Sequence, residues 1–189
     1  MKKQDTVAVI LAAGQGTRMS KKYNKLLLPL GTRTIVEYSL DAFLDHRRIR
    51  KIFLAVSSKD LNIFENLFPR SIVLVQGGER RQDSVSNAMR KIMEEKKIPE
   101  LVLIHDGARP FCTRKLIDRI IDSTNEFGAA IPVLPVTDTI RNIREEKIKV
   151  IDRNNLFSVQ TPQGFRTKLI NKALNQAIKK NLEVTDDAS

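Results

Sequence analysis

Short apolar runs rich in β-branched residues alternate along the chain with stretches of helical periodicity. This alternation is typical of βαβ units, in which helices connect parallel strands. Because each apolar run is continuous, the strands suit a sheet that is covered on both faces. We therefore predict an α/β fold with a Rossmann-like, mostly parallel sheet flanked by helices, and with strands at 7–11, 52–56, 72–75, 101–104 and 129–133.

Four segments between or after these strands have the spacing of a buried helix face. Thr34 followed by Glu37 is a capping box, which predicts a helix start. Thr113 and Gly128 are placed to begin and end another helix. The expected buried positions are Ile35, Leu40, Phe43 and Leu44; Val85, Ala88, Met89 and Ile92; Leu116, Ile117, Ile120 and Ile121; and Leu169, Ala173, Leu174, Ala177 and Ile178.

The stretch at about 136–165 departs from this alternation. Two short alternating segments, 139–143 and 148–151, flank a polar turn, which predicts a β-hairpin arm that projects from the main sheet. At ~150 residues per domain, the whole of 1–189 fits one domain that includes this arm. The chain stops on small polar residues just after a helix, so we interpret it as a fragment that lacks a C-terminal portion.

Composition narrows the possible partners. Lys and Arg number 33 against 22 Asp and Glu, a net charge of +11, so an anionic partner is expected. Aromatic residues are only 5% and do not alternate with basic runs, which argues against nucleic acid and favours small, multiply charged substrates. No apolar run approaches the ~20 residues of a membrane helix, so we expect a cytoplasmic protein without membrane contact. One cysteine and two histidines exclude a Cys/His zinc site, and any metal would need oxygen ligands.

In an open α/β sheet, ligands bind at the carboxyl ends of the strands. The loop after the first strand carries Gly14 and Gly16, whose backbone can approach phosphate oxygens, together with Arg18 and Lys25 as positive charges. A nucleoside triphosphate would fit there. The P-loop pattern fails because no Gly-Lys pair is present, and the dinucleotide fingerprint fails because Met19 stands where a third small residue is needed.

Two more loops carry candidate chemistry. Gly77 and Gly78 precede a helix whose start can face a polar ligand, or they form a plain turn in which Asp83 or Ser84 caps the helix. After the fourth strand, Asp106 could hold Mg²⁺ and Arg109 a phosphate, although Asp106 could equally be a turn residue. His105 and Cys112 are not expected to act in catalysis; structural packing explains both.

A fourth group combines hydroxyls with an arginine and could bind a phosphomonoester that bears hydroxyl groups. It consists of Asp152-Arg153 on the exit of the hairpin, Gln160-Thr161-Pro162-Gln163 beyond it, and Thr185 near the end of the chain. A solvated hairpin edge would explain the same residues without a ligand.

Taken in order, these segments resemble the 2-C-methyl-D-erythritol 4-phosphate cytidylyltransferases, and the resemblance runs from Val7 to the last residue. The matching segments are Leu11-Ala-Ala-Gly-x-Gly-x-Arg18-Met19 and Lys25; Gly77-Gly78 with Arg81 and Asp83-Ser84-Val85; His105-Asp-Gly-Ala-Arg-Pro110; Asp138-Thr139; Arg153-Asn-x-Leu156; Gln160-Thr-Pro-Gln163; and Thr185-Asp-Asp-Ala-Ser189.

The resemblance implies a nucleotidyltransferase fold like that of the type A glycosyltransferases, and the transfer of CMP from CTP to 2-C-methyl-D-erythritol 4-phosphate with release of pyrophosphate. This is a step of non-mevalonate isoprenoid biosynthesis, expected with Mg²⁺ and in a homodimer whose arm reaches the partner's site. The resemblance implies that CTP is contacted by Ala12, Ala13, Gly14, Gly16, Gly78, Glu79 and Ser84. It implies that Arg18 and Lys25 are the cations that stabilise the phosphates. The implied acceptor contacts are Asp106, Arg109, Thr139, Arg153, Thr161 and Thr185, of which Thr139 and Arg153 come from the neighbouring subunit.

The sequence departs from the family's usual pattern at the lysine loop. Asn24 stands where Pro is common and Leu26 where Gln is common, so we expect a less rigid loop. The missing C-terminal portion supplies a further lysine in the family. Ribitol-5-phosphate cytidylyltransferases share several of the motifs and remain an alternative. Sugar-1-phosphate nucleotidyltransferases share the first loop but would not account for the other segments. A CTP-binding module without chemistry is another, and nucleic-acid binding is a weaker one.

Overall fold

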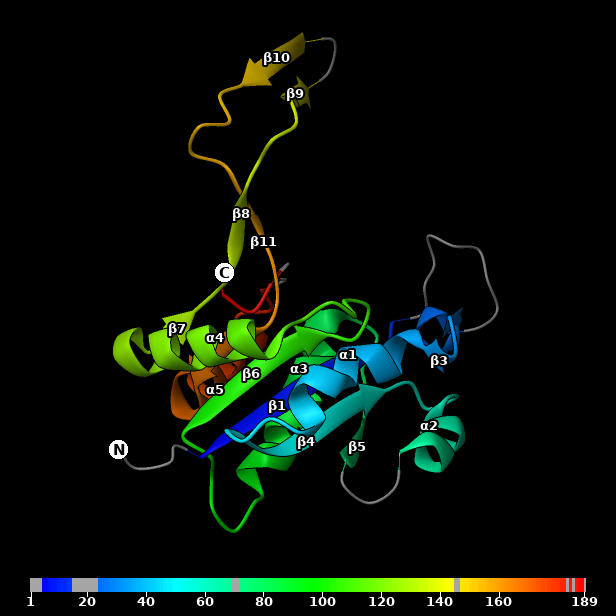
Figure 1. Ribbon diagram of the computed structural model, residues 1–189. Helices are drawn as coiled ribbons and strands as arrows, with labels where there is room; N and C mark the ends of the chain where they lie inside the picture. The colour runs from blue at the N-terminus through cyan, green and yellow to red at the C-terminus, as the bar shows by residue number, and fades with distance from the viewer. Residues whose placement is uncertain are drawn as a thin grey trace.

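A six-stranded sheet forms the centre of the computed structural model, which describes residues 5–14, 24–68, 72–144, 147–182, 184 and 186–188 (Figure 1). From one edge to the other, its strands are β5 (Ile72–Gln76), β4 (Ile49–Val56), β1 (Thr6–Ala12), β6 (Leu101–Asp106), β12 (Gln163–Arg166) and β7 (Ala129–Ala130). The first four are parallel, and they confirm four of the predicted strands. Their apolar runs are buried because helices cover both faces of the sheet.

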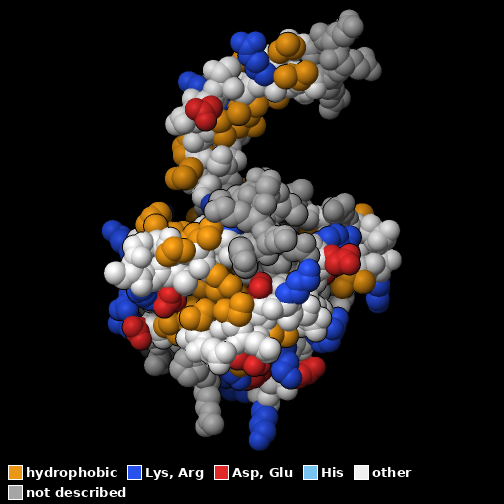
Figure 2. Space-filling view, turned by 90° about the vertical axis from the view of Figure 1, so that its right-hand side faces the viewer, with side chains coloured by type: hydrophobic (Ala, Val, Ile, Leu, Met, Phe, Trp, Pro, Cys, Tyr) orange, Lys and Arg blue, Asp and Glu red, His pale blue; other side chains and the backbone are white. Residues whose placement is uncertain are grey.

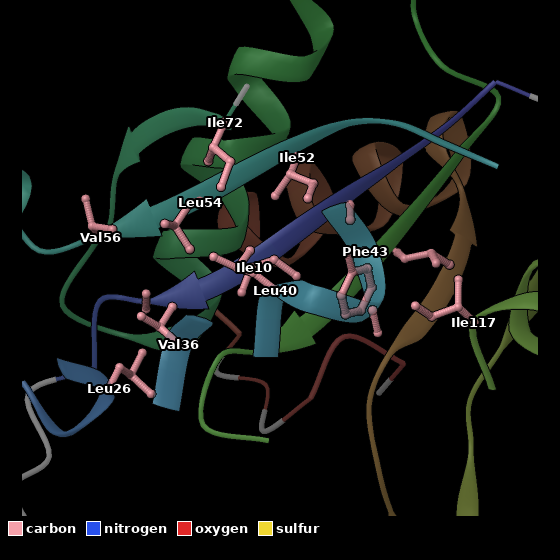
Figure 3. Close-up of a cluster of buried hydrophobic side chains, with 14 of the residues drawn as sticks. Ile10, Leu26, Val36, Leu40, Phe43, Ile52, Leu54, Val56, Ile72 and Ile117 are labelled. Carbon is pink, nitrogen blue, oxygen red and sulfur yellow. The ribbon is translucent and has the colours of Figure 1, made fainter. Parts of the chain in front are cut away.

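The two faces of the sheet have separate cores. One contains Ile10 of β1 together with residues of α1 (Ile35–Leu44), α2 (Leu61–Leu67) and α4 (Arg114–Phe127). Figure 3 shows this cluster, with Leu40 and Phe43 of α1 against the sheet. The other contains the alternate residues of β1 together with residues of α3 (Arg81–Met93) and α5 (Thr167–Lys179). The strand alternation of β1 thus divides its side chains between two helical layers.

Helix starts and ends agree with the sequence signals. The Thr34 N–H donates to Glu37 Oε2 at 2.7 Å, which confirms the capping box. Thr113 Oγ1 accepts the Leu116 N–H at 3.2 Å, and Gly128 ends α4 with a φ of 89°, a left-handed conformation that favours glycine. Before α1, the chain forms a 3₁₀ turn and a small hairpin, η2 (Lys25–Leu27), β2 (Pro29–Leu30) and β3 (Arg33–Thr34). None of the helices among the described residues is long and apolar enough to cross a bilayer.

The predicted buried faces are correct for α3, largely correct for α1 and α4, and mostly wrong for α5. Leu44, at the end of α1, is exposed, whereas Val36 is buried. In α5, Leu174 is buried as predicted, but Leu169 and Ile178 are exposed, and Ile170, which was not predicted, is buried. The helix packs on β12 and α3 through one narrow stripe, and the apolar residues beside that stripe remain on the surface.

The expected strand at 129–133 is wrong as a single element. It is divided into β7 and β8 (Val133–Pro135), which belong to different sheets, and Pro132 lies between them. Proline has no N–H to donate, so it interrupts a ladder of strand hydrogen bonds. The sequence also missed β12, a short strand that runs antiparallel to both β6 and β7 and brings the chain back into the central sheet.

The predicted hairpin is confirmed, and its antiparallel strand pairing continues closer to the central sheet than expected. β9 (Ile140–Arg144) pairs with β10 (Lys147–Ile151), and nearer the sheet β8 pairs with β11 (Phe157–Val159), all antiparallel. We call residues 133–159 the arm; it projects away from the sheet in Figure 1. The predicted range of 136–165 therefore included residues of β12, which are buried in the central sheet.

Candidate functional site

A pocket of about 220 Å³ lies among the first, second and third predicted loops. These loops meet at the carboxyl end of the parallel strands, where the sequence placed its candidate chemistry. The lining residues are Leu11, Ala13, Gly14, Lys25, Leu26, Gly78, Glu79, Arg80, Arg81, Ser84, Asp106 and Ala108. Polar side chains and exposed backbone thus converge in one cleft that suits a small ligand.

Glycines allow the first two loops to approach each other closely. The Gly77 N–H donates to Val56 O at 2.7 Å, and a Cβ on Gly77 would lie 2.2 Å from Ala13 Cβ. A Cβ on Gly78 would likewise lie 2.3 Å from the Asp83 side chain. No larger residue fits at either position, so backbone rather than side chain forms this wall of the pocket.

Ser84 fixes the second loop from inside the helix that follows. Its hydroxyl accepts the Gly78 N–H at 3.0 Å and lies 3.3 Å from Arg80 O, to which it donates. The helix begins at Arg81, three residues before Ser84, so the expectation that Asp83 or Ser84 is its N-cap residue is wrong. Asp83 instead stands in the first turn and accepts the Arg80 N–H at 3.1 Å. A carboxylate there also interacts favourably with the helix dipole.

Lys25 is held at the pocket by its neighbour Asn24. The Asn24 side-chain amide donates to Ala12 O at 3.0 Å and to Asp60 Oδ2 at 2.9 Å, and its oxygen accepts the Leu26 N–H at 3.1 Å. These bonds fix the start of η2. The expected loss of rigidity concerns a loop of which residues 15–23 lie outside the described residues, so it stays a prediction. Lys25 has no ion pair with any residue that the structure describes.

Asp106, at the end of β6, lies between two guanidinium groups. Arg81 Nε and Nη2 each lie 3.3 Å from Asp106 Oδ1, and Arg109 Nε lies 3.1 Å from Asp106 Oδ2. Arg109 also donates through Nη1 to Gln160 Oε1. Charge-assisted bonds of this kind orient a carboxylate strongly. The acid and the arginine predicted as neighbours are therefore paired, and a second arginine holds the acid from the other side.

Arg81 continues this network to the last described residues. Its Nη1 lies 2.7 Å from Asp187 Oδ2, and the Asp187 side chain is only 2% exposed. Burial would lower the pKa of Arg81, but the charges of Asp187 and Asp106 outweigh it and raise that pKa. For Asp187, burial raises the pKa in spite of the nearby guanidinium. The two aspartates hold Arg81 in its charged form inside the protein.

His105 and Thr161 form a buried support beneath Asp106. The Asp106 N–H donates to Thr161 Oγ1 at 3.3 Å, and Thr161 Oγ1 lies 2.9 Å from His105 Nδ1. His105 Nε2 lies 3.1 Å from Arg109 O. Burial lowers the pKa of His105 to about 4, so the ring is neutral at neutral pH, with Nε2 as the donor and Nδ1 as the acceptor. His105 thus has the structural role expected of it.

Cys112 fits the expectation that it is no nucleophile. Burial raises the pKa of its thiol to about 12, and the thiolate is the reactive form of cysteine.

The structure brings most of the candidate residues to this pocket. Seven of them line it, Ala12 lies just behind it at the end of β1, and Arg109 and Thr161 contact Asp106. Thr139 and Arg153 lie on the arm, do not line the pocket and are exposed to solvent. Gly16, Arg18 and Thr185 lie outside the described residues.

Sequence reasoning gave no role to two residues of this site, Arg81 and Asp187. Both stand in segments that carried the family resemblance. A further signal was available for Arg81, because the first residue of a helix after the third strand must lie at the same sheet edge as Asp106. No local pattern pairs it with Asp187, which is 106 positions later.

The acidic residues offer little to a resident metal ion. Among the residues that the structure describes, no three His, Cys, Asp or Glu side chains are grouped to hold one. Two carboxylates line the pocket, Glu79 and Asp106, and both oxygens of Asp106 already face guanidinium groups. Mg²⁺ often binds through one or two carboxylates together with substrate phosphates and water. These residues fit an ion that arrives with a phosphorylated ligand rather than a cage built by the protein.

A mostly parallel sheet with a glycine-walled pocket at its carboxyl edge, bordered by Lys25 and an arginine pair, defines an α/β protein that binds a phosphorylated ligand. Comparison with known proteins specifies the class further. Residues 6–189 match the family model described as 2-C-methyl-D-erythritol 4-phosphate cytidylyltransferase, and the chain belongs to this family.

Curated relatives and solved structures agree with this assignment. A Bacillus velezensis protein named 2-C-methyl-D-erythritol 4-phosphate cytidylyltransferase is 40% identical over 97% of this chain and 80% of its own length. The crystal structure of the enzyme of that name from Thermus thermophilus is 35% identical, with a TM-score of 0.76 over 96% of this chain and 81% of that one. A 4-diphosphocytidyl-2C-methyl-D-erythritol synthase from Anaerococcus prevotii is 27% identical, with a TM-score of 0.83 over 99% and 82%.

Proposed function

We propose that this protein transfers CMP from CTP to 2-C-methyl-D-erythritol 4-phosphate and releases pyrophosphate, a step of non-mevalonate isoprenoid biosynthesis. The observation that carries the proposal is the convergence of Gly78, Lys25 and Asp106, from three separate loops, on one pocket in a chain of this family. The names of the relatives support this acceptor over ribitol 5-phosphate. Because both substrates carry several negative charges and cannot diffuse through a bilayer, we place the reaction in the cytoplasm.

In the reaction, an oxygen of the acceptor's phosphate attacks the α-phosphorus of CTP. A new P–O bond forms there, the bond between the α-phosphorus and the bridging oxygen to the β-phosphate breaks, and that oxygen leaves with pyrophosphate. A phosphate dianion is already a nucleophile, so no general base is needed. Catalysis then consists of positioning and of stabilising negative charge.

The nucleotide half of the site would be built by the two glycine loops. The backbone at Ala12, Ala13, Gly14 and Gly16, together with Gly78, Glu79 and Ser84, would contact CTP. Lys25 lines the same pocket, and its ammonium would stabilise charge on the α-phosphate and the leaving group. Arg18 is assigned the same task from its position in the sequence.

The acceptor half would lie on the side of Asp106. Its carboxylate would accept hydrogen bonds from the polyol hydroxyls, and Arg109 would contact the phosphate. Thr161 supports Asp106 through the backbone N–H and is buried, so its contribution to acceptor binding would be largely through this support. Thr185 is proposed as a further acceptor contact from its motif alone.

Mg²⁺ would enter with CTP. Bound to the nucleotide's phosphates, it would neutralise part of their charge, and Asp106 is the carboxylate that could give it a protein oxygen. The protein's own residues hold the phosphates and the acceptor in place.

A homodimer would complete the site. Thr139 and Arg153 are exposed on the arm and face no residue of the pocket in the same chain, which supports their action in the site of a partner subunit. The apolar residues of the arm are also exposed, as Figure 2 shows, and would be covered by such contact.

The test is an assay of pyrophosphate release with CTP and Mg²⁺. We expect release only when 2-C-methyl-D-erythritol 4-phosphate is also present, together with the cytidine diphosphate product. Ribitol 5-phosphate, tested in parallel, should react far more slowly. Binding of CTP without turnover on either acceptor would refute the catalytic proposal and leave a nucleotide-binding module.

A further inference from the structure

The first turn of α3 connects three parts of the site that are far apart in the sequence. Arg81 reaches Asp106 at the end of β6 and Asp187 near the end of the chain. The next residue, Gln82, accepts the Val184 N–H at 3.0 Å and donates to Leu182 O at 3.3 Å. We call the described residues 182, 184 and 186–188 the terminal segment; two consecutive side chains of α3 therefore fasten it.

Each nitrogen of the Arg81 guanidinium contacts a carboxylate. Its Nε and Nη2 face Asp106 Oδ1, and its Nη1 faces Asp187 Oδ2. A planar guanidinium can serve two carboxylates in fixed directions, which a lysine ammonium cannot do. Although Arg81 lines the pocket, each of its three guanidinium nitrogens has a carboxylate partner.

The charges of this cluster cancel. Arg81 and Arg109 carry two positive charges, and Asp106 and Asp187 carry two negative ones. If Arg81 were absent, the carboxylates of Asp106 and buried Asp187 would share a single guanidinium. One negative charge would then be uncompensated where the acceptor's phosphate must bind. The arrangement thus allows an acidic residue and an anionic substrate to occupy the same half of the site.

We propose that Arg81 is a positioning residue for the acceptor: it orients Asp106 through one edge of its guanidinium and, through Asp187, holds the terminal segment against the acceptor half of the site. This inference rests on the proposed function for its kinetic consequences. It makes no use of a contact between Arg81 and CTP. The residue acts through Asp106 and the terminal segment.

Kinetic constants of Arg81→Gln and Arg81→Lys test this role. Arg81→Gln should raise KM for the acceptor roughly 10- to 100-fold, because a small displacement of positioning groups is costly. The Kd of CTP, measured by calorimetry, should stay within about twofold. Arg81→Lys should fall between the wild type and Arg81→Gln, because a lysine can serve one carboxylate but not both. An equal loss of affinity for CTP and acceptor, or an unchanged acceptor KM, would overturn the proposal.

Arg48→Gln is the matched control. Arg48 is also an arginine between two aspartates, with Nη1 at 3.2 Å from Asp118 and 2.8 Å from Asp122, but those aspartates belong to α4 and lie outside the pocket. It should lose a similar number of ion pairs and keep the acceptor KM of the wild type. A rise in acceptor KM in Arg48→Gln as large as in Arg81→Gln would show a general effect of stability and would count against the proposal.

Hydrogen exchange separates this inference from the proposed function. In Arg81→Gln, the amides of Val184 and Asp187 should exchange faster than in the wild type, while amides of β1 keep their protection. This result is expected whether or not the protein turns over the acceptor. Unchanged exchange at Val184 and Asp187 would refute the positioning role even in an active enzyme, and a wild type that is inactive on CTP and acceptor would refute only the function.

Discussion

The pocket and the arm are held together by different forces. At the pocket, polar side chains stand on a sheet whose strands are buried on both faces, and Asp106 and His105 have hydrogen-bond partners within the chain. On the arm, strand pairing provides most of the structure, and apolar side chains such as Ile143 and Val150 are 66% and 65% exposed. The sheet thus fixes its polar groups by packing on both faces, whereas the side chains of the arm depend mainly on the pairing of its own strands.

The largest effect on stability should follow from removing an aromatic side chain that is buried against the sheet. Phe43 is fully buried between α1 and the strands. Phe43→Ala should therefore lower the free energy of unfolding by about 3–5 kcal/mol. Phe157 of the arm is 53% exposed. Phe157→Ala should change the free energy of unfolding by less than about 0.5 kcal/mol. Urea unfolding of both variants measures the contrast, and similar losses in the two would mean that the arm is as tightly packed as the core.

Protonation of histidines at low pH should destabilise the sheet rather than the arm, because both histidines lie outside residues 133–159. The pKa of His105 falls from an ordinary 6.5 to about 4 in the folded protein, so folding favours the neutral ring. The corresponding stability is present above the ordinary pKa and is lost as the pH falls towards the folded one, in total about 3 kcal/mol.

Urea unfolding between about pH 7.5 and pH 4.5 tests this expectation. The pKa of His46 is also lowered, chiefly by burial, and it contributes in the same direction. His105→Gln should therefore be less stable at neutral pH but show a weaker dependence on pH. An unchanged slope in that variant would contradict the assignment to His105.

Loss of a cation at the pocket should affect turnover and spare the fold. Lys25→Ala should reduce kcat at least about 100-fold, which corresponds to ~2.7 kcal/mol of lost transition-state stabilisation. Arg18→Ala should have a similar effect. Since Lys25 pairs with no carboxylate of the described chain, the melting temperature should stay the same. Lys91→Ala, at a surface pair with Glu94, is the control and should keep full activity. Turnover near that of the wild type in Lys25→Ala would remove it from the catalytic assignment.

The smallest effect on stability is expected for substitutions on the arm, which should instead impair the proposed sharing of the site between subunits. Arg153→Ala should leave the free energy of unfolding within about 0.5 kcal/mol of the wild type and still impair turnover. When Arg153→Ala and Lys25→Ala proteins are mixed and allowed to exchange subunits, mixed dimers contain one intact site, and about a quarter of the wild-type activity should return. Activity no higher than the sum of the two variants would refute a site shared between subunits.

The sequence predicted the parts of the fold that depend on burial and local signals. The continuous apolar runs of β1, β4, β5 and β6 and the capping box at Thr34 need no knowledge of distant residues. β12 could not be predicted in this way, because four residues that include Gly164 have neither length nor apolar character, and their place is set by pairing with β6 and β7. Most of the buried face of α5 was missed for the same reason, since its partners β12 and α3 decide which residues are covered.

The pocket was predictable to the extent that strand ends of a parallel sheet lie at one edge. Glycine and charged residues in three loops were enough to place Gly78, Lys25 and Asp106 together. The ion pair of Arg81 with Asp187 was not, because it joins the start of one helix to a segment that follows another. Such a pair has no sequence spacing of its own, and only the folded chain shows it.

The arm leaves the sheet from β7 and returns through β12, and these two strands are hydrogen-bonded neighbours. Its outward and return paths thus form one irregular antiparallel ribbon anchored at a single place. Residues could be added or deleted in pairs near the tip without altering a strand of the central sheet. The length of the arm is consequently adjustable on its own, and the geometry of the pocket stays constant while it changes.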